Sequence, residues 1–152
     1  MKVIVIGAAG HIGTYLVPML VNAGYDTVAI TRKMSAPYED APAWHTVQRV
    51  LIDRENDPGF IEKIKSMQPD IIIDLVNFNI EETKKIVENF QGTNLSHYLY
   101  CSSCWAHGMA EVLPFDPDSL RKEPLDAYGK DKFASEMYLK EQYRTNRSEE
   151  HT

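Results

Sequence analysis

The chain has 152 residues, a length that suits one folded domain with a sizeable core. Its hydrophobic content of 43% and charged content of 25% are typical of a globular protein, and its net charge of −6 disfavours binding to nucleic acid or to an anionic membrane surface. No stretch is apolar over the roughly 20 residues of a membrane span, and we find no signal peptide, so a cytoplasmic protein is expected.

The first predicted elements are a strand at residues 3–6 and an amphipathic helix at residues 15–21, joined by a glycine-rich turn. A β-branched strand, spaced glycines and a helix, in this order, are typical of a turn that binds nucleotide phosphates. Gly7 allows a tight turn, Gly10 lets the backbone approach a pyrophosphate, and Gly13 lets the helix pack against the strand. The spacing is G-x-x-G-x-x-G and not the commonest G-x-G-x-x-G, so an ordinary glycine-rich turn is the alternative.

The rest of the chain alternates predicted strands and helices. Strands are expected at residues 26–31, 46–52, 71–76 and 97–101, and helices at residues 58–67, 80–90 and about 127–144. This alternation predicts a doubly wound parallel α/β sheet of the Rossmann type with about five strands. One domain over residues 1–144 is expected, and the polar residues 145–152 are expected to form a disordered or foreign tail.

The two cysteines, Cys101 and Cys104, form a C-x-x-C pair. A zinc site needs about four ligands, and the chain offers no second pair, so no metal site is expected. Two incidental thiols at a strand end are the preferred interpretation, and a redox pair stays open as the alternative.

Candidate acid–base residues lie in the last predicted helix, where Tyr128 and Lys132 are four residues apart and share one face. A free phenol keeps its proton at neutral pH, and a nearby ammonium favours the phenolate, which suits a base acting on a substrate hydroxyl or carbonyl. Ser102 and Ser103 follow the strand predicted at residues 97–101, and parallel sheets bind ligands beyond the carboxyl ends of their strands. Taken singly, an exposed Tyr–Lys pair and a turn-forming serine pair would explain these residues equally well.

Together, the glycine turn, the serine pair and the Tyr-x-x-x-Lys spacing resemble the extended branch of the short-chain dehydrogenase/reductase superfamily, the NAD-dependent epimerase/dehydratase family. The resemblance covers nearly the whole predicted domain and includes the run from Tyr98 to Gly108. It implies an NAD(P)-dependent oxidoreductase or epimerase that transfers a hydride at a substrate hydroxyl or carbonyl carbon. It also implies that Ser103 polarises the substrate oxygen, that Tyr128 is the general acid/base, and that Lys132 binds the nicotinamide ribose.

The same resemblance implies a set of cofactor contacts. They fall on Gly7, Gly10, His11, Ile12, Gly13, Arg32, Asp53, Arg54, Leu75 and Val76, with Tyr128 and Lys132. NAD enzymes usually carry an acid at the end of the second strand, where this chain has Thr31 followed by Arg32. A guanidinium binds a 2′-phosphate well, so NADP is preferred to NAD, although a solvated loop cation would give the same pattern. Asp53 matches the position that contacts adenine, whereas Val76 is bulkier than the small residue usual in the family.

Family members are roughly twice as long, and their second half supplies further strands and most of the substrate pocket. The chain is therefore expected to be truncated before those strands and the substrate domain, which would leave residues 97–101 as an exposed, association-prone edge. The expected partner is a small molecule, either a sugar nucleotide or another carbonyl or hydroxyl compound, and homodimers are common in the family. Trp105 and His107 depart from the family pattern and put the sugar nucleotide in doubt. The alternative function is a dinucleotide-binding or regulatory module without catalysis, or an inactive fragment.

Overall fold

The computed structural model describes residues 1–34, 37–109, 112–114, 116 and 123–149. The chain forms two compact units, while the prediction of one domain over residues 1–144 stays a prediction. The first unit comprises Met1–Asn77 and Lys85–Cys101, and the second comprises Phe78–Lys84 and Ser102–Thr152.

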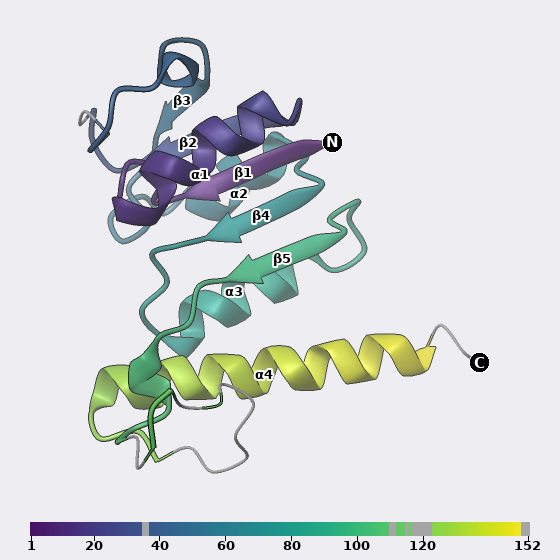
Figure 1. Cartoon of the computed structure of the whole chain (residues 1–152). Helices are drawn as coiled ribbons and strands as arrows, with labels where there is room; N and C mark the ends of the chain where they lie inside the picture. The colour runs from purple at the N-terminus through teal and green to yellow at the C-terminus, as the bar shows by residue number, and fades with distance from the viewer. Residues whose placement is uncertain (35–36, 110–111, 115, 117–122, 150–152) are drawn as a thin grey trace. The chain divides into compact units, whose positions relative to one another are not determined.

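The first unit is built on a parallel sheet with the strand order β3-β2-β1-β4-β5 (Figure 1). The strands are β1 (Lys2–Ile6), β2 (Asp26–Thr31), β3 (Gln48–Leu51), β4 (Ile71–Asp74) and β5 (His97–Tyr100). The chain starts in the middle of the sheet, runs outward through β2 and β3, and then crosses back to β4, so the direction of winding reverses between β1 and β4. This confirms the predicted Rossmann-type α/β fold.

Among the described residues, four α-helices and two short 3-10 helices connect or follow the strands. They are α1 (His11–Asn22), η1 (Pro42–His45), α2 (Phe60–Ser66), α3 (Ile80–Phe90), η2 (Cys104–Ala106) and α4 (Ala127–Glu149). Helix α1 begins earlier than its apolar stripe suggested, so Gly13 lies inside the helix. Helix α4 continues past residue 144 through a polar sequence that has no hydrophobic periodicity from which its end could be predicted. None of the helices in these described ranges combines the length and apolar character that crossing a membrane requires.

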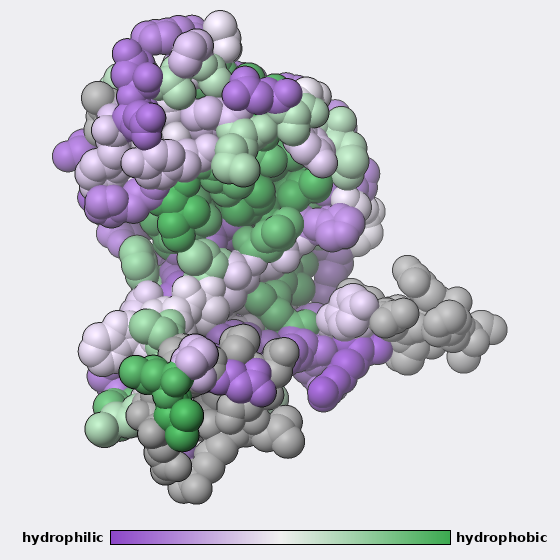
Figure 2. Space-filling view, in the orientation of Figure 1, coloured by the Kyte–Doolittle hydropathy of each residue, from purple (hydrophilic) through white to green (hydrophobic). Residues whose placement is uncertain are grey.

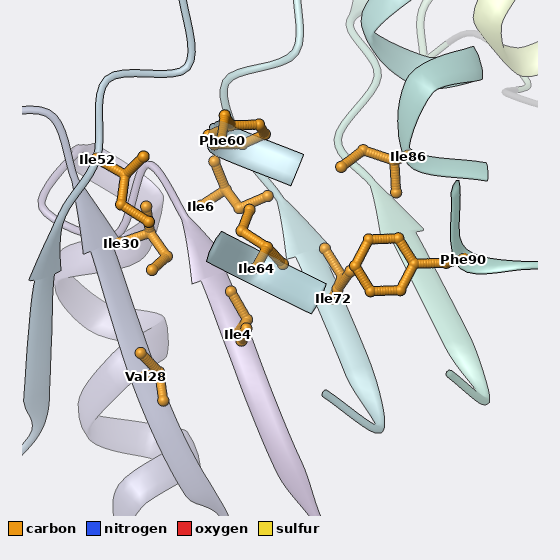
Figure 3. Packing of buried hydrophobic residues seen from close by; sticks show 10 residues of the cluster. All are labelled: Ile4, Ile6, Val28, Ile30, Ile52, Phe60, Ile64, Ile72, Ile86 and Phe90. Atoms are coloured by element: carbon orange, nitrogen blue, oxygen red, sulfur yellow. The ribbon is translucent and has the colours of Figure 1, made fainter. Parts of the chain in front are cut away.

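Apolar side chains cover both faces of the central strands. On one face, helices α2 and α3 pack on a cluster shown in Figure 3: Ile4, Ile6, Val28, Ile30, Ile52, Phe60, Ile64, Ile72, Ile86 and Phe90. On the other face, α1 and η1 pack on Val3, Val5, Ala8, Val17, Ala29 and Trp44. Successive residues of β1 alternate between the two clusters because side chains of a strand point alternately to its two faces. The unbroken apolar run of β1 is therefore the signature of a strand buried on both sides.

The face that carries α1 is less covered toward β5. Ile73 packs at the margin of the second cluster, and its partner across the strands, Leu99, is 47% exposed. Figure 2 shows apolar surface on this face of the first unit. In the described part of the chain, β5 pairs only with β4, so its outer backbone groups form an open sheet edge.

Candidate functional site

The glycine turn joins β1 to α1 and is tied to the neighbouring strand. Gly7 has a φ of +82°, in the left-handed region, and the N–H groups of Gly7 and Ala8 both donate to the carbonyl of Ile30 at 3.1 Å. The N–H of Gly10 donates to the carbonyl of Gly7 at 3.0 Å, and Gly10 then caps α1 in an extended conformation with no side chain over the helix end. The first N–H groups of a helix have no intrahelical partners, so this end of α1 fits an anion such as a pyrophosphate.

Close packing leaves no room for a side chain at Gly7 or Gly13, but it does leave room for one at Gly10. A Cβ at Gly13 would lie 2.1 Å from the Ala8 carbonyl oxygen, and a Cβ at Gly7 would lie 2.5 Å from Cγ1 of Val76. A Cβ at Gly10 would meet only the Gly7 carbonyl oxygen, at 3.3 Å. The missing side chain at Gly10 therefore keeps the helix end open to a ligand more than it serves the fold.

Two other predicted contacts, His11 and Ile12, start helix α1 and are exposed. The His11 ring stacks on the Tyr38 ring with 4.1 Å between centroids. Tyr38 also donates its N–H to Oγ1 of Thr14 at 3.1 Å, so the loop after β2 folds back onto the start of α1.

Polar groups gather at the carboxyl ends of β2 and β3. Thr31 is buried, and its Oγ1 has no hydrogen-bond partner among the described residues. The carboxylate of Asp53 accepts bonds from the Glu55 N–H and from the backbone and side-chain nitrogens of Asn56. The pKa of Asp53 is lowered, first by the Asn56 side chain and also by the positive charge of Arg32. Arg32 and Asp53 thus attract each other electrostatically, and Arg32 is exposed to solvent.

Arg54, which follows Asp53, is bound within the protein. Its guanidinium donates to both carboxylate oxygens of Asp74, at 2.8 and 2.7 Å, and to the carbonyl of Val76 at 3.1 Å. Leu75, between these two partners, donates its N–H to the Ile6 carbonyl at 3.1 Å. The predicted contact segment Leu75–Val76 is therefore held from both sides, by the sheet and by Arg54.

The Tyr-x-x-x-Lys pair lies at the start of α4 in the second unit. Asp126 precedes the helix, and its Oδ1 accepts the Gly129 N–H at 2.7 Å, as an N-cap does. Nζ of Lys132 lies 5.6 Å from the centroid of the Tyr128 ring and 5.9 Å from that of Phe78. Lys132 is only 2% exposed, and aromatic faces at this range stabilise a cation that has left water. The predicted pair is brought together, and Phe78 is a neighbour that the sequence pattern did not reveal.

The serine pair has two different sets of contacts. Oγ of Ser103 accepts the Trp105 N–H at 3.3 Å, so the Ser103 hydroxyl keeps its proton for donation. Oγ of Ser102 donates to Oε1 of Glu136 at 2.5 Å. Helix η2 packs on the start of α4 so closely that a Cβ at Gly129 would lie 2.4 Å from the Trp105 carbonyl oxygen. Glu136 was missed from the sequence, although it lies one further helical turn from Lys132 on the same face.

Neither cysteine forms a disulfide; Cys101 belongs to the first unit and Cys104 to the second. Within the described residues, no three His, Cys, Asp or Glu side chains gather in a way that could hold a metal ion. A cavity of about 260 Å³ opens next to the amino ends of β4 and β5, and it is lined by Lys65, Gln68, Pro69, Phe90, Thr93 and Asn94. None of the predicted site residues lines this cavity, and ligands of such sheets bind at the opposite, carboxyl ends.

Known proteins resemble this chain over nearly all of its length. It is 26% identical to the UDP-glucose 4-epimerase of Lactobacillus helveticus and 24% identical to that of Drosophila melanogaster, in each case over 91% of this chain and 46% or 47% of the relative. The chain thus spans about half the length of the curated relatives it matches. A solved UDP-glucose 4-epimerase from Thermotoga maritima, with UDP-glucose, matches 95% of this chain and 52% of its own at a TM-score of 0.77 and 23% identity.

A second solved structure, UDP-glucose 4-epimerase from Brucella ovis in complex with NAD, matches 92% of this chain and 47% of its own at a TM-score of 0.72 and 20% identity. These structural matches agree with the fold described above. The model of the NAD-dependent epimerase/dehydratase family matches residues 3–148, and the chain therefore belongs to that family.

Proposed function

We propose that the first unit binds a nicotinamide dinucleotide and that the protein interconverts a hydroxyl and a carbonyl group on a small-molecule substrate. The observation that carries this proposal is the buried Lys132 beside Tyr128, because a protein rarely buries a lysine without a specific use. The open helix end at Gly10 supports the dinucleotide part of the proposal independently.

Three residues of this chain, Ser103, Tyr128 and Lys132, have separate roles in the proposed reaction. The Ser103 hydroxyl donates a hydrogen bond to the substrate oxygen, since its Oγ accepts the Trp105 N–H and its hydrogen is left to face the substrate. Oη of Tyr128 takes or returns the proton of the reacting hydroxyl, and the ammonium of Lys132 binds the ribose and favours the charged phenolate. The dinucleotide, when bound, supplies the hydride acceptor or donor.

We propose NADP as the preferred dinucleotide. Arg32 stands at the end of β2 with no carboxylate at that position, and the buried Oγ1 of Thr31 beside it has bonding capacity to spare. A charge-assisted bond to a 2′-phosphate contributes about 1.5–3 kcal/mol, which is roughly tenfold or more in affinity. Calorimetric titration should therefore show tighter binding of NADPH than of NADH, and Arg32→Gln should weaken NADPH alone. Tighter binding of NADH by the unaltered chain would reverse this preference.

We propose a sugar nucleotide as the substrate, because the relatives named above are UDP-glucose 4-epimerases and one was solved with UDP-glucose. The assay is interconversion of UDP-glucose and UDP-galactose in the presence of either dinucleotide. Tyr128→Phe should lower the rate by about 10²–10⁴-fold, the usual contribution of a positioned acid or base. Tyr143→Phe, on the same helix and 62% exposed, is the matched control and should leave the rate unchanged. Loss of activity in Cys104→Ala would favour the redox pair instead.

A second candidate function is dinucleotide binding without catalysis, because the glycine turn and the serine–tyrosine–lysine set lie in different units. The first unit contains the whole glycine turn, which supports phosphate binding even without turnover. Dinucleotide binding without interconversion of any tested sugar nucleotide would support this binding module. Absence of dinucleotide binding would contradict both candidates.

A further inference from the structure

Arg54 and Asp74 form a buried ion pair at the end of β4, and the proposed reaction does not use either residue. The side chain of Arg54 is 10% exposed and that of Asp74 is 0% exposed. The guanidinium lies 5.2 Å from the centroid of the Phe60 ring, at the margin of the apolar core. Taking two charges out of water costs so much that an apolar pair of similar size is often as stable or more stable. The pair is therefore poorly explained by stability alone.

Further bonds turn this pair into a rigid network around Asp74. Oδ2 of Asp74 also accepts the hydroxyl of Tyr98 at 2.8 Å and Nδ2 of Asn77 at 3.3 Å. Burial, followed by the charge of Asp74, raises the pKa of the Tyr98 phenol, so that hydroxyl keeps its proton and stays a donor. Arg54 adds the bond to the Val76 carbonyl, and the chain that leaves β4 is thereby fixed over three residues.

Val76 connects this network to the glycine turn. Its Cγ1 and Cγ2 lie 2.5 and 3.0 Å from the position that a Cβ on Gly7 would take. The isopropyl group thus occupies the space that the missing Gly7 side chain leaves, directly against the residue with the left-handed φ. A shift of the Val76 backbone would either press on Gly7 or leave a gap beside it.

We propose that Arg54 and Asp74 form a clamp that positions Val76 against Gly7 and so keeps the phosphate-binding turn in its binding shape. Arg54 is then a positioning residue and does not itself contact the dinucleotide. The proposal rests on the dinucleotide binding proposed above. It also explains how this chain carries a valine where the family usually has a small residue, because the valine is held by its own carbonyl.

The test compares dinucleotide affinity with thermal stability in variants of the whole chain. Asp74→Leu combined with Arg54→Met replaces the buried pair by apolar groups, and the Tyr98 hydroxyl and the Asn77 amide, which lose their acceptor, should lower the melting temperature without abolishing the cooperative melt. Losing a pre-organised turn should raise the Kd for NADH and for NADPH about five- to tenfold, and equally, because the clamp touches neither ribose hydroxyl. Arg49→Met removes another arginine of the same sheet, whose guanidinium lies over Trp44, and should leave both affinities unchanged.

Each outcome decides between the clamp and its alternatives. Unchanged Kd values in a folded double variant overturn the clamp, and a loss confined to NADPH overturns it in favour of Arg54 as a ligand of the 2′-phosphate. If the double variant does not fold, Asp74→Asn decides by the same criterion, since Asp74 is fully buried and can act on a ligand only through its neighbours. Failure of the unaltered chain to bind either dinucleotide refutes the proposed function itself, and this result is separate from the variant comparison.

Discussion

Gly10 and Gly13 lie three residues apart, at the N-cap and inside the first turn of α1, yet alanine should affect mainly dinucleotide affinity at Gly10 and mainly stability at Gly13. At Gly13 a new methyl group would lie 2.1 Å from the Ala8 carbonyl oxygen, 2.6 Å from its carbon and 2.7 Å from its Cα. These are backbone atoms that cannot rotate away, so α1 and the turn must separate by roughly 1 Å. Overpacking of this kind costs about 1–3 kcal/mol, and alanine's higher helix propensity returns up to about 1 kcal/mol.

We therefore expect Gly13→Ala to lower the free energy of unfolding by about 1–2 kcal/mol, which corresponds to about 2–8 °C in melting temperature for a chain of this size. Gly10→Ala places its methyl group 3.3 Å from the Gly7 carbonyl oxygen, at an extended backbone that any residue adopts. Its cost is the difference between glycine and alanine as N-caps, about 0.5 kcal/mol. The same methyl group would stand where the dinucleotide phosphates approach, so the affinity for NADPH should fall at least about tenfold.

The assay is a thermal melt of each variant with and without saturating NADPH, alongside calorimetric titration. Gly24→Ala is the matched control: it has a φ of +84° and nothing within 4 Å, so it measures backbone strain without a clash. Wild-type affinity in Gly10→Ala would refute the placement of phosphates at this turn. An unchanged melting temperature in Gly13→Ala would show that the packing of α1 on the turn is looser than described here.

Two further predictions concern the sheet. The backbone N–H of Lys2 donates to the Asp70 carboxylate at 2.7 Å and holds the pKa of that carboxyl below its usual value of 3.8. The stability that the ionised Asp70 contributes is therefore present above pH 3.8 and is lost as the pH falls through the lowered pKa. Asp70→Asn should flatten the acid side of a plot of melting temperature against pH, and an unaltered acid side would contradict this. The open edge of β5 and the exposed Leu99 should make the chain self-associate as its concentration rises. Sedimentation velocity should show this association in the unaltered chain and its suppression in Leu99→Lys. An unaltered chain that stays monomeric at all concentrations would refute the reasoning.

The sheet and the glycine turn were predictable because their signals are local. Four consecutive apolar residues, Val3 to Ile6, followed by a glycine turn indicated a strand covered on both faces, and the alternation of strands and helices indicated a parallel, doubly wound sheet. The strand order came only from the structure. Element ends were predicted less well. Helix α1 starts at His11, before its first apolar stripe residue, since Gly10 ends the turn without a side-chain cap that a pattern could reveal.

The contacts of the site were less predictable because they depend on residues distant in sequence. Arg54 follows a strand at the carboxyl edge of the sheet, where a cation looks like a ligand-binding group, and only the strand register brings Asp74 to it. Phe78 follows β4 and contacts the Lys132 ammonium 54 positions later, which no spacing rule connects. Local spacing therefore predicted the Tyr128–Lys132 pair, and only the three-dimensional structure shows what surrounds it.

The surroundings of Lys132 lead to a last prediction, which separates a catalytic role from a structural one. A lysine that is 2% exposed has lost most of its hydration, and its ammonium has partners within the protein in addition to the rings of Tyr128 and Phe78. Lys132→Met leaves those partners without a cation, so the melting temperature should fall, whereas a catalytic role also requires that interconversion of UDP-glucose and UDP-galactose be abolished in a variant that still melts cooperatively. Thermal melts and the activity assay on the same preparation measure both. Activity that falls only in proportion to the folded fraction would mean that Lys132 merely holds the start of α4 together, and the strongest support for the proposed chemistry would be lost.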